Sequence, residues 1–309
     1  MRALITGVTG QDGSYLAQQL ADAGWQVSGM TRINDPQADW AAQLVPGMQL
    51  VAGDLAEPFS LYSALAVSLP DAVFNMAAMS NVRESWQHPL LAGELTGMGA
   101  ARMLEATRVF NPETRFIQAS SSDVFQDTWR ADESSPMLPR SPYGAAKLFA
   151  HHHVALARDV HGMHASNAIM FNHESPRRAP QFVSRKIACA VARIARGQQE
   201  KLALGPVSSR RDWGWAPEFT RALHLMAQAE SPGDYVIATG TSHTVGELAE
   251  AMFAAAGLDA ENHITVNPAF HRPNDMDSMG LPGKAKEILG WQHNVSFTDL
   301  ARLMVEAEL

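Results

Sequence analysis

The sequence predicts an α/β fold, a doubly wound parallel sheet with a smaller α/β region towards the C-terminal side. Three observations support this prediction. Short apolar runs alternate with helix-like stretches along the chain, as in parallel sheets that are covered on both faces. A glycine-rich turn directly follows the first apolar run. With 309 residues, 46% of them hydrophobic, the chain is long enough for one large domain or two interlocked ones.

The first elements are expected to be a strand over residues 2–6, a turn with the spacing GxxGxxG over residues 7–13, and a helix over residues 14–23. This order forms the phosphate cradle of a Rossmann fold, where backbone N–H groups and a helix N-terminus face a dinucleotide pyrophosphate. Glycines also make ordinary loops, but the position after a first strand favours cofactor binding. The expected cofactor contacts are Gly7, Thr9, Gly10, Gln11, Asp12 and Gly13.

The second expected strand, residues 25–30, is followed by Thr31 and Arg32. Proteins that bind NAD usually carry an acidic residue here for the ribose hydroxyls, whereas an arginine suits the 2′-phosphate of NADP. A solvated loop arginine is the alternative. We therefore expect NADP as the cofactor, with Arg32 as a contact.

Five further strands are expected at residues 49–52, 72–76, 115–119, 164–171 and 235–238. The third strand of the series runs into Asp54 and Leu55, in a position suited to adenine contact, and the fourth into Ala77 and Ala78, whose small side chains let the backbone approach a cofactor. Parallel strands bind ligands at their carboxyl ends. The serine cluster after the fifth strand, residues 120–122, should therefore face the same crevice.

No linker or internal repeat divides the chain. The second half is richer in loops and prolines, which indicates a capping region made from separate segments. We expect a dinucleotide-binding region over residues 1–171 and 233–240. The substrate-binding region is expected over residues 172–232 and 241–309.

Tyr143 and Lys147 stand four residues apart at the expected start of a helix. Four residues bring a helix round to about 40° from its starting direction, so the two side chains share one face. A phenol with a pKa near 10 transfers protons poorly at neutral pH unless a cation stabilises its phenolate. An exposed pair is the alternative, but the nucleotide-binding motifs around it favour a catalytic pair.

Composition argues against several partners. The formal net charge is −8 and the only basic clusters are pairs, which disfavours nucleic acid and anionic membranes. No run is apolar enough to span a bilayer, and no secretory signal is recognisable, so a cytoplasmic location is the default expectation. The single cysteine, Cys189, forbids an internal disulfide. No metal site is expected, because the consecutive residues His151–His153 would point about 100° apart on a helix.

Several sequence blocks carry a family resemblance. TGVTGQDGSYLA, NMAAMSNVRESW, PRSPYGAAKL, FNHESPRRAPQFVSRKI, RRDWGWAPEF, VIATG, FHRPNDMD and KAKEILGW follow one another along the chain. They resemble the extended short-chain dehydrogenase/reductase superfamily and, within it, the GDP-mannose 4,6-dehydratases. The glycine turn and YxxxK indicate only the superfamily, whereas FNHESPRR followed by RDWG is the specific part.

The resemblance implies roles for individual residues. Tyr143 would be the acid/base at the sugar C4 hydroxyl, and Lys147 would lower its pKa and hold the nicotinamide ribose. Ser121 takes the place of a threonine that hydrogen-bonds the C4 oxygen, and Asp123 the place of a glutamate that removes the C5 proton. The positions that grip the nucleotide diphosphate and base would be Asn172, Arg178, Lys186, Arg211 and Arg272, with Asp275 where the family has a glutamate.

The implied reaction converts GDP-mannose to GDP-4-keto-6-deoxy-mannose and leaves NADP unchanged, because hydride removed from C4 returns at C6. Asp123 is one methylene shorter than glutamate, which keeps open an NADPH-dependent reductase of the 4-keto product. A non-catalytic NADP-binding protein is a third alternative, disfavoured by the presence of Tyr143 and Lys147. The connection from Arg32 to Leu50 is shorter than in the family, and this favours a homodimer over a tetramer.

Overall fold

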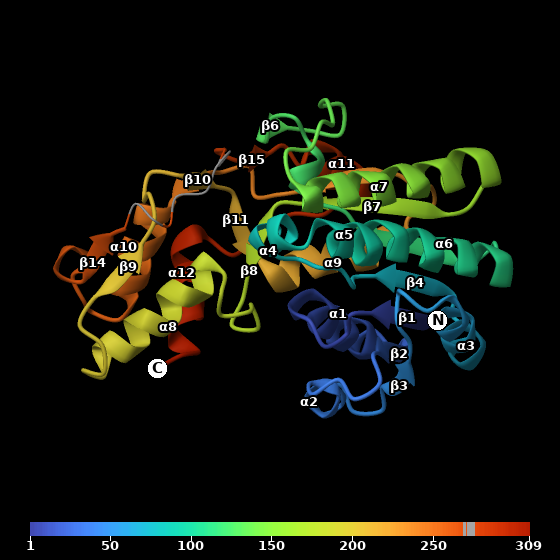
Figure 1. The fold of residues 1–309 in the computed structure, drawn as a ribbon, viewed down its shortest axis with the longest axis horizontal. Coiled ribbons are helices and arrows are strands. Elements are labelled where there is room, and N and C mark those ends of the chain that lie inside the picture. The colour runs from blue at the N-terminus through green and yellow to red at the C-terminus, as the bar shows by residue number, and fades with distance from the viewer. Residues whose placement is uncertain (268–269, 271–275) are drawn as a thin grey trace.

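A computed structural model describes residues 1–267, 270 and 276–309. Its main feature is a sheet of seven strands in the order β12-β7-β5-β4-β1-β2-β3 (Figure 1), and each neighbouring pair in this sheet is parallel. The strands are β1 (Arg2–Thr6), β2 (Gln26–Thr31), β3 (Gln49–Ala52), β4 (Ala72–Asn75), β5 (Arg115–Ala119), β7 (Ala165–Met170) and β12 (Asp234–Ile237). The predicted fold class is confirmed, and each of these strands lies within one residue of its predicted bounds.

Helices cover both faces of this sheet. Along β1, Leu4 packs into one hydrophobic core and Ile5 into the other, because successive side chains of a strand point to opposite faces. One face lies beneath α1 (Gln11–Asp22) and α9 (Ala216–Gln228). The other lies beneath α3 (Pro58–Ser68), α6 (Gly99–Phe110) and α7 (Pro142–His161). The sheet is therefore doubly wound, as the alternation of strands and helices predicts.

The first helix begins earlier than predicted. α1 starts at Gln11 rather than Ser14, so the third glycine of the turn, Gly13, lies inside its first turn. The sequence pattern could not show this, because glycine is a poor helix former. Shorter elements lie between the strands of the first half of the chain. They are α2 (Ala38–Leu44), α4 (Val82–Gln87), α5 (Pro89–Ala92), η1 (Gly93–Met98) and η2 (Ser122–Val124).

A smaller lobe with its own core lies at the other end of the molecule from β3 and α3 (Figure 1). Its helices are α8 (Val183–Ala195), α10 (Val245–Ala255) and α12 (Phe297–Glu306), and they pack around residues such as Val191, Phe253 and Met304. A short turn, η3 (Ala260–Asn262), follows α10. This core is separate from the two that cover the large sheet, so the lobe is a packing unit of its own.

Four two-stranded sheets surround or join this lobe. They pair β8 (Asn172–Glu174) with β11 (Trp213–Trp215), β9 (Leu202–Leu204) with β14 (Ile264–Val266), β10 (Arg210–Arg211) with β13 (His243–Thr244), and β6 (Trp129–Ala131) with β15 (Met279–Gly280). Two helices from the segments expected to bind substrate, α9 and α11 (Gly283–Leu289), pack instead against the large sheet, through residues such as Phe219 and Ala285.

Candidate active site

The glycine turn between β1 and α1 approaches neighbouring backbone closely. Gly7 has φ +65°, and a Cβ there would lie 2.9 Å from the backbone of Ala77. A Cβ on Gly13 would lie 2.3 Å from the carbonyl oxygen of Gly7. Gly10 caps α1 without any side-chain hydrogen bond, so the first N–H groups of the helix remain available to an anion. These features fit a pyrophosphate at this turn.

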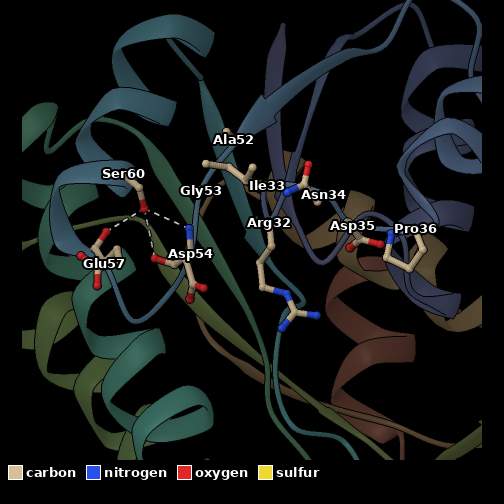
Figure 2. Close-up of a pocket in the computed structure, with 10 residues that line it drawn as sticks. All are labelled: Arg32, Ile33, Asn34, Asp35, Pro36, Ala52, Gly53, Asp54, Glu57 and Ser60. Atoms are coloured by element: carbon tan, nitrogen blue, oxygen red, sulfur yellow. Dashed lines mark hydrogen bonds between the residues drawn. The ribbon is translucent and has the colours of Figure 1, made fainter.

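A cavity of about 420 Å³ opens beyond the turn, at the ends of β2 and β3. Figure 2 shows the side chain of Arg32 extending into it between Asp54 on one side and Asp35 on the other. Thr9 donates a hydrogen bond to Asp35 at 3.1 Å. The lining residues are Arg32, Ile33, Asn34, Asp35, Pro36, Ala52, Gly53, Asp54, Glu57 and Ser60. Leu55 is not among them, because its side chain is buried in the core under α3 and α6.

α7 presents the predicted tyrosine and lysine on one buried face. Ser141 begins the helix by accepting a hydrogen bond from the backbone N–H of Gly144 at 3.0 Å. Tyr143 and Lys147 are only 8% and 4% exposed, and Lys147 Nζ lies 5.8 Å from the centre of the tyrosine ring. Lys147 also donates to the carbonyl oxygen of Ala119 at the end of β5, at 2.6 Å. The helix therefore brings the pair to the carboxyl edge of the sheet.

Ser121 and Asp123 lie against the first turn of α7. Ser121 caps the short turn η2 and accepts a hydrogen bond from the backbone N–H of Asp123 at 3.2 Å. A Cβ on Gly144 would lie 2.4 Å from the carbonyl oxygen of Asp123, so only glycine permits this approach. A hydrogen bond between Ser121 and Tyr143 lowers the pKa of the phenol, and the charge of Asp123 raises it. The four predicted catalytic residues therefore converge.

The pKa of Tyr143 differs from the sequence prediction. Burial raises the pKa of Tyr143 well above 10, and this effect outweighs the lowering by Ser121 and Arg178. The sequence predicted that Lys147 lowers this pKa. Burial lowers the pKa of Lys147 itself to about 8, although Asp12 and Asp123 oppose the change. Because the lysine ammonium is bound to the carbonyl of Ala119, its charge is already engaged with the backbone.

A buried ion pair connects α1 to β8. His173 contacts the carbonyl oxygen of Phe171 through Nδ1 at 2.7 Å and the carboxylate of Asp12 through Nε2 at 3.0 Å. Both partners are acceptors, so only the doubly protonated imidazolium satisfies both contacts. Burial opposes the charge on Asp12, but His173 lowers the pKa of that carboxyl to about 2. The pair holds the carboxylate in place beside the N-terminus of α1.

The residues predicted to hold the sugar nucleotide fall into two groups. Arg178 lies 3.4 Å from Glu174, its guanidinium lies 3.8 Å from the centre of the Phe182 ring, and its charge reaches Tyr143 and Asp12. It therefore belongs with the catalytic group. Asn172 lies in the same sequence block, on β8, which pairs with β11.

Lys186 and Arg211 lie on the smaller lobe. Lys186 donates to the carbonyl oxygen of Ala203 at 2.7 Å and lies 4.5 Å from the centre of the Phe270 ring. Arg211 donates to the carbonyl oxygen of Met276 at 2.7 Å. Two further predicted contacts, Arg272 and Asp275, lie outside the described residues.

Two features are absent from the part of the chain that the structure describes. No group of three or more histidine, cysteine, aspartate or glutamate side chains there could hold a metal ion. No helix there is long and apolar enough to cross a membrane.

The family model described as GDP-mannose 4,6 dehydratase matches residues 4–304. The chain belongs to this family. One relative, "GDP-mannose 4,6 dehydratase 1" of Arabidopsis thaliana, is 41% identical over 99% of this chain and 89% of its own length. The matched range includes the glycine turn at Gly7–Gly13 and the segment from Ser121 to Lys147.

Solved structures show the same fold. The UDP-glucose 4-epimerase of Thermus thermophilus in complex with NAD has a TM-score of 0.87 and 27% identity, and covers 99% of this chain and 98% of its own. The structure of RMD from Pseudomonas aeruginosa complexed with NADPH has a TM-score of 0.84 and 22% identity, and covers 99% of each chain.

In this member of the GDP-mannose 4,6-dehydratase family, the contact of His173 with Asp12 is not indicated by either residue's own motif. The structure adds Ser175, which donates to Gln11 at 2.8 Å, and Arg177, which donates to Ser14 at 3.1 Å. One signal could have drawn attention to this group. These residues lie between Asn172 and Arg178 in a single block, and the block contacts α1 as well as the group around Tyr143.

Proposed function

We propose that this chain is an NADP-dependent nucleotide-sugar 4,6-dehydratase that converts GDP-mannose to GDP-4-keto-6-deoxy-mannose. The observation that carries the proposal is the convergence of Ser121, Asp123, Tyr143 and Lys147 at the carboxyl edge of a sheet whose first turn suits a pyrophosphate. Membership of the dehydratase family supports it over the 4-keto reductase. The burial of Tyr143 and Lys147 argues against a non-catalytic protein, because an exposed pair was the alternative to a catalytic one.

In this proposal, Tyr143 reacts as its phenolate and takes the proton of the C4 hydroxyl while Ser121 hydrogen-bonds the same oxygen. The positive charge of an oxidised nicotinamide bound beside it would offset the burial that raises the pKa of the phenol. A nicotinamide cofactor held at this edge of the sheet would supply the hydride acceptor for C4 and the hydride donor for C6. Asp123 removes the C5 proton, which the new C4 ketone has made acidic, and passes it to the departing C6 hydroxyl, so that water is lost across C5 and C6. When hydride reaches C6, C5 takes up one proton, which balances the proton that Tyr143 removed from the C4 hydroxyl. Lys147 holds the nicotinamide ribose, and its ammonium already lies on the same buried face as the phenol.

The short reach of Asp123 is the main chemical objection to a dehydratase, and the packing at Gly144 answers it. The first turn of α7 comes close enough to the carbonyl oxygen of Asp123 that no side chain larger than hydrogen fits between them. The backbone of residue 123 therefore lies nearer the tyrosine helix than a bulkier residue at 144 would allow. In this proposal, the close approach makes up part of the reach that the shorter side chain lacks, since misplacement by about 1 Å can cost about 10²-fold in rate.

Arg32 supports NADP over NAD. Its side chain extends into the cavity at the ends of β2 and β3, and a guanidinium binds phosphate through two parallel hydrogen bonds. The neighbouring carboxylate of Asp35 already accepts a hydrogen bond from Thr9. We therefore assign the 2′-phosphate to Arg32. The adenine would lie near Asp54, with Leu55 contributing only its backbone.

The GDP moiety would be held by both groups of polar residues. Asn172 and Arg178 lie near the catalytic face and suit the diphosphate, because Arg178 is half of a charge pair beside Tyr143. Lys186 and Arg211, with Arg272 and Asp275, would hold the nucleotide on the smaller lobe. In this arrangement the residues 1–171 and 233–240 bind the dinucleotide, and the remaining segments bind the substrate.

A homodimer is proposed because α5, η1 and α7 expose apolar side chains together. Leu90 is 88% exposed and Val160 is 67% exposed. Between η1 and α7 lies an apolar groove of about 460 Å³ that includes Met98 and Phe149. A second copy would cover these helices, and sedimentation of the purified protein as a monomer would contradict this. We retain the cytoplasm as the expected location.

The deciding experiment incubates the purified protein with GDP-mannose and a trace of NADP. The expected result is a 4-keto sugar without net formation of NADPH. If GDP-mannose is unchanged but NADPH is oxidised in the presence of GDP-4-keto-6-deoxy-mannose, the protein is the reductase. If neither substrate reacts, the enzyme proposal is wrong.

A further inference from the structure

The face of α7 that carries Tyr143 and Lys147 continues one turn further to His151. These residues follow one another at intervals of four, so they lie in one row along the helix. His151 Nδ1 lies 3.2 Å from Ser120 Oγ, within hydrogen-bonding distance. His151 and Ser120 are each only 3% exposed. The row of side chains therefore extends one helical turn beyond the catalytic pair. Its last member, His151, contacts Ser120, which precedes Ser121 in the chain.

The other side of the imidazole faces Asp234 on β12. Nε2 of His151 lies 3.6 Å from Asp234 Oδ2. Arg158 holds that carboxylate through two hydrogen bonds, at 2.9 and 3.1 Å, and Asn167 donates a third at 2.9 Å. Asn167 also donates to the carbonyl oxygen of His151 at 3.1 Å. The ring thus lies between a fixed acceptor and the serine hydroxyl.

Serine, histidine and aspartate in this order are also found in hydrolases, where the serine attacks a substrate. Here the serine and the histidine are buried, so no substrate reaches the hydroxyl. The contact acts on the protein instead. Ser120 lies between Ala119, whose carbonyl oxygen binds Lys147 at 2.6 Å, and Ser121, which caps the turn that carries Asp123.

We propose that His151 is a positioning residue for the sugar chemistry, and that it acts by fixing Ser120 and with it the segment from Ala119 to Ser121. The proposal rests on the proposed function, because it assumes that Ser121 and Lys147 take part in the reaction. His151 would then fix the positions of both Lys147 and Ser121. Lys147 is bound to Ala119 at one end of the segment, and Ser121 is the other end.

The test compares His151→Leu, Ser120→Ala and the double variant with the wild type. Misplacement of about 1 Å can cost about 10²-fold in rate, so a smaller shift of this segment should lower kcat by about tenfold in either single variant. KM for GDP-mannose should stay within about twofold, because the nucleotide contacts lie elsewhere. If His151 acts through Ser120, the double variant should be no slower than the slower single variant.

His152→Leu is the matched control, since it makes the same substitution at the exposed neighbouring position of the helix, and its kcat should equal that of the wild type. His151→Gln, whose amide can also accept from the serine and donate to the carboxylate, should recover most of the activity. A purely structural role would lower the thermal midpoint and kcat without this recovery.

Three results would overturn the proposal: an unchanged kcat in folded Ser120→Ala, independent losses in the double variant, or no recovery in His151→Gln. If His151→Leu does not fold, Ser120→Ala decides alone, because it removes only one hydroxyl. A wild type inactive on GDP-mannose would instead refute the proposed function. The same variants would then be scored by NADPH oxidation with the 4-keto sugar, which uses the same tyrosine and lysine.

Discussion

The large sheet and the smaller lobe are built in opposite ways. In the sheet, strands of four to six residues lie side by side in one array of seven, and their ends carry the turn at Gly7 and the group around Ser121. In the lobe, strands of two or three residues pair only two at a time, as β9 does with β14. In the proposed function, the continuous sheet positions the reacting groups, and the short pairs of the lobe position the residues that bind substrate.

The pair of Asp12 and His173 is one of the contacts that join the two regions. Asp12 belongs to the first turn of α1, and His173 to β8, which pairs with the strand that leads into α9. From the different construction of the sheet and the lobe, we expect substitutions on the sheet side to change the rate of the reaction. Substitutions at the junction should change stability, and substitutions in the nucleotide cavity should change affinity only.

Tyr143→Phe should have the largest effect. Without its hydroxyl, residue 143 cannot take the C4 proton, so kcat should fall by about 10³-fold, within the usual range for general acid–base groups. NADP binding, measured by titration, should change little because the ring remains buried. Tyr62→Phe, on the surface of α3, is the control. Normal turnover by Tyr143→Phe would remove Tyr143 from the site.

Asp123→Asn should lower kcat by about 10²-fold, since the amide cannot accept the C5 proton. The first oxidation at C4 should persist, so bound NADPH should accumulate when GDP-mannose is added, and its absorbance measures this. A reductase would tolerate the substitution far better. Wild-type turnover without accumulation of NADPH would show that another group performs the elimination.

His173→Asn should lower the free energy of unfolding by about 3 kcal/mol, because it leaves the buried Asp12 carboxylate without its partner. The Asp12 pKa falls from 3.8 to about 2 on folding, so its contribution is present above pH 3.8 and is lost as pH falls through 2. The His173 pKa rises above 6.5, so its contribution is present below pH 6.5 and is lost as pH rises through the raised value.

The stability difference between wild type and His173→Asn should therefore be largest between about pH 4 and 6.5. Urea unfolding at several pH values measures it. A second substitution, Asp12→Asn, should restore part of the loss by removing the unpaired charge. A difference independent of pH would mean that the pair is not ionised.

Arg32→Ala should have the smallest effect and should act on binding alone. Loss of a charge-assisted hydrogen bond costs about 1.5–3 kcal/mol, so the Kd for NADP should rise at least about tenfold. The Kd for NAD should stay the same, because NAD lacks the 2′-phosphate. Equal weakening of both cofactors would show that Arg32 contacts another part of the dinucleotide.

Most of the sheet region could be predicted from sequence because its signals are local. β1 to β5 are short apolar runs, and the turn at Gly7 follows one of them directly. Tyr143 and Lys147 were predicted by helical spacing. The resemblance supplied Ser121 and Asp123, since nothing in their own spacing indicates their roles.

The rest depends on contacts between distant residues. His173 meets Asp12 across 161 positions, and His151 meets Asp234 on the last strand of the sheet; neither pairing leaves a pattern in the sequence. The raised pKa of Tyr143 was missed for a similar reason, because it comes chiefly from burial of the phenol, which the spacing of two residues on one helix does not show. The spacing of residues in a sequence shows which side chains share a helix face, but not how deeply those side chains are buried.

The contact between Gly144 and Asp123 has a consequence for how such enzymes can change. A single methyl group at position 144 would displace the carbonyl oxygen of Asp123, which would lie 2.4 Å from it. The size of residue 144 and the position of the backbone at residue 123 are therefore linked, whatever the length of the acid side chain. A substitution at residue 144 would reach the eliminating carboxylate through the main chain that carries it, without touching the carboxylate itself.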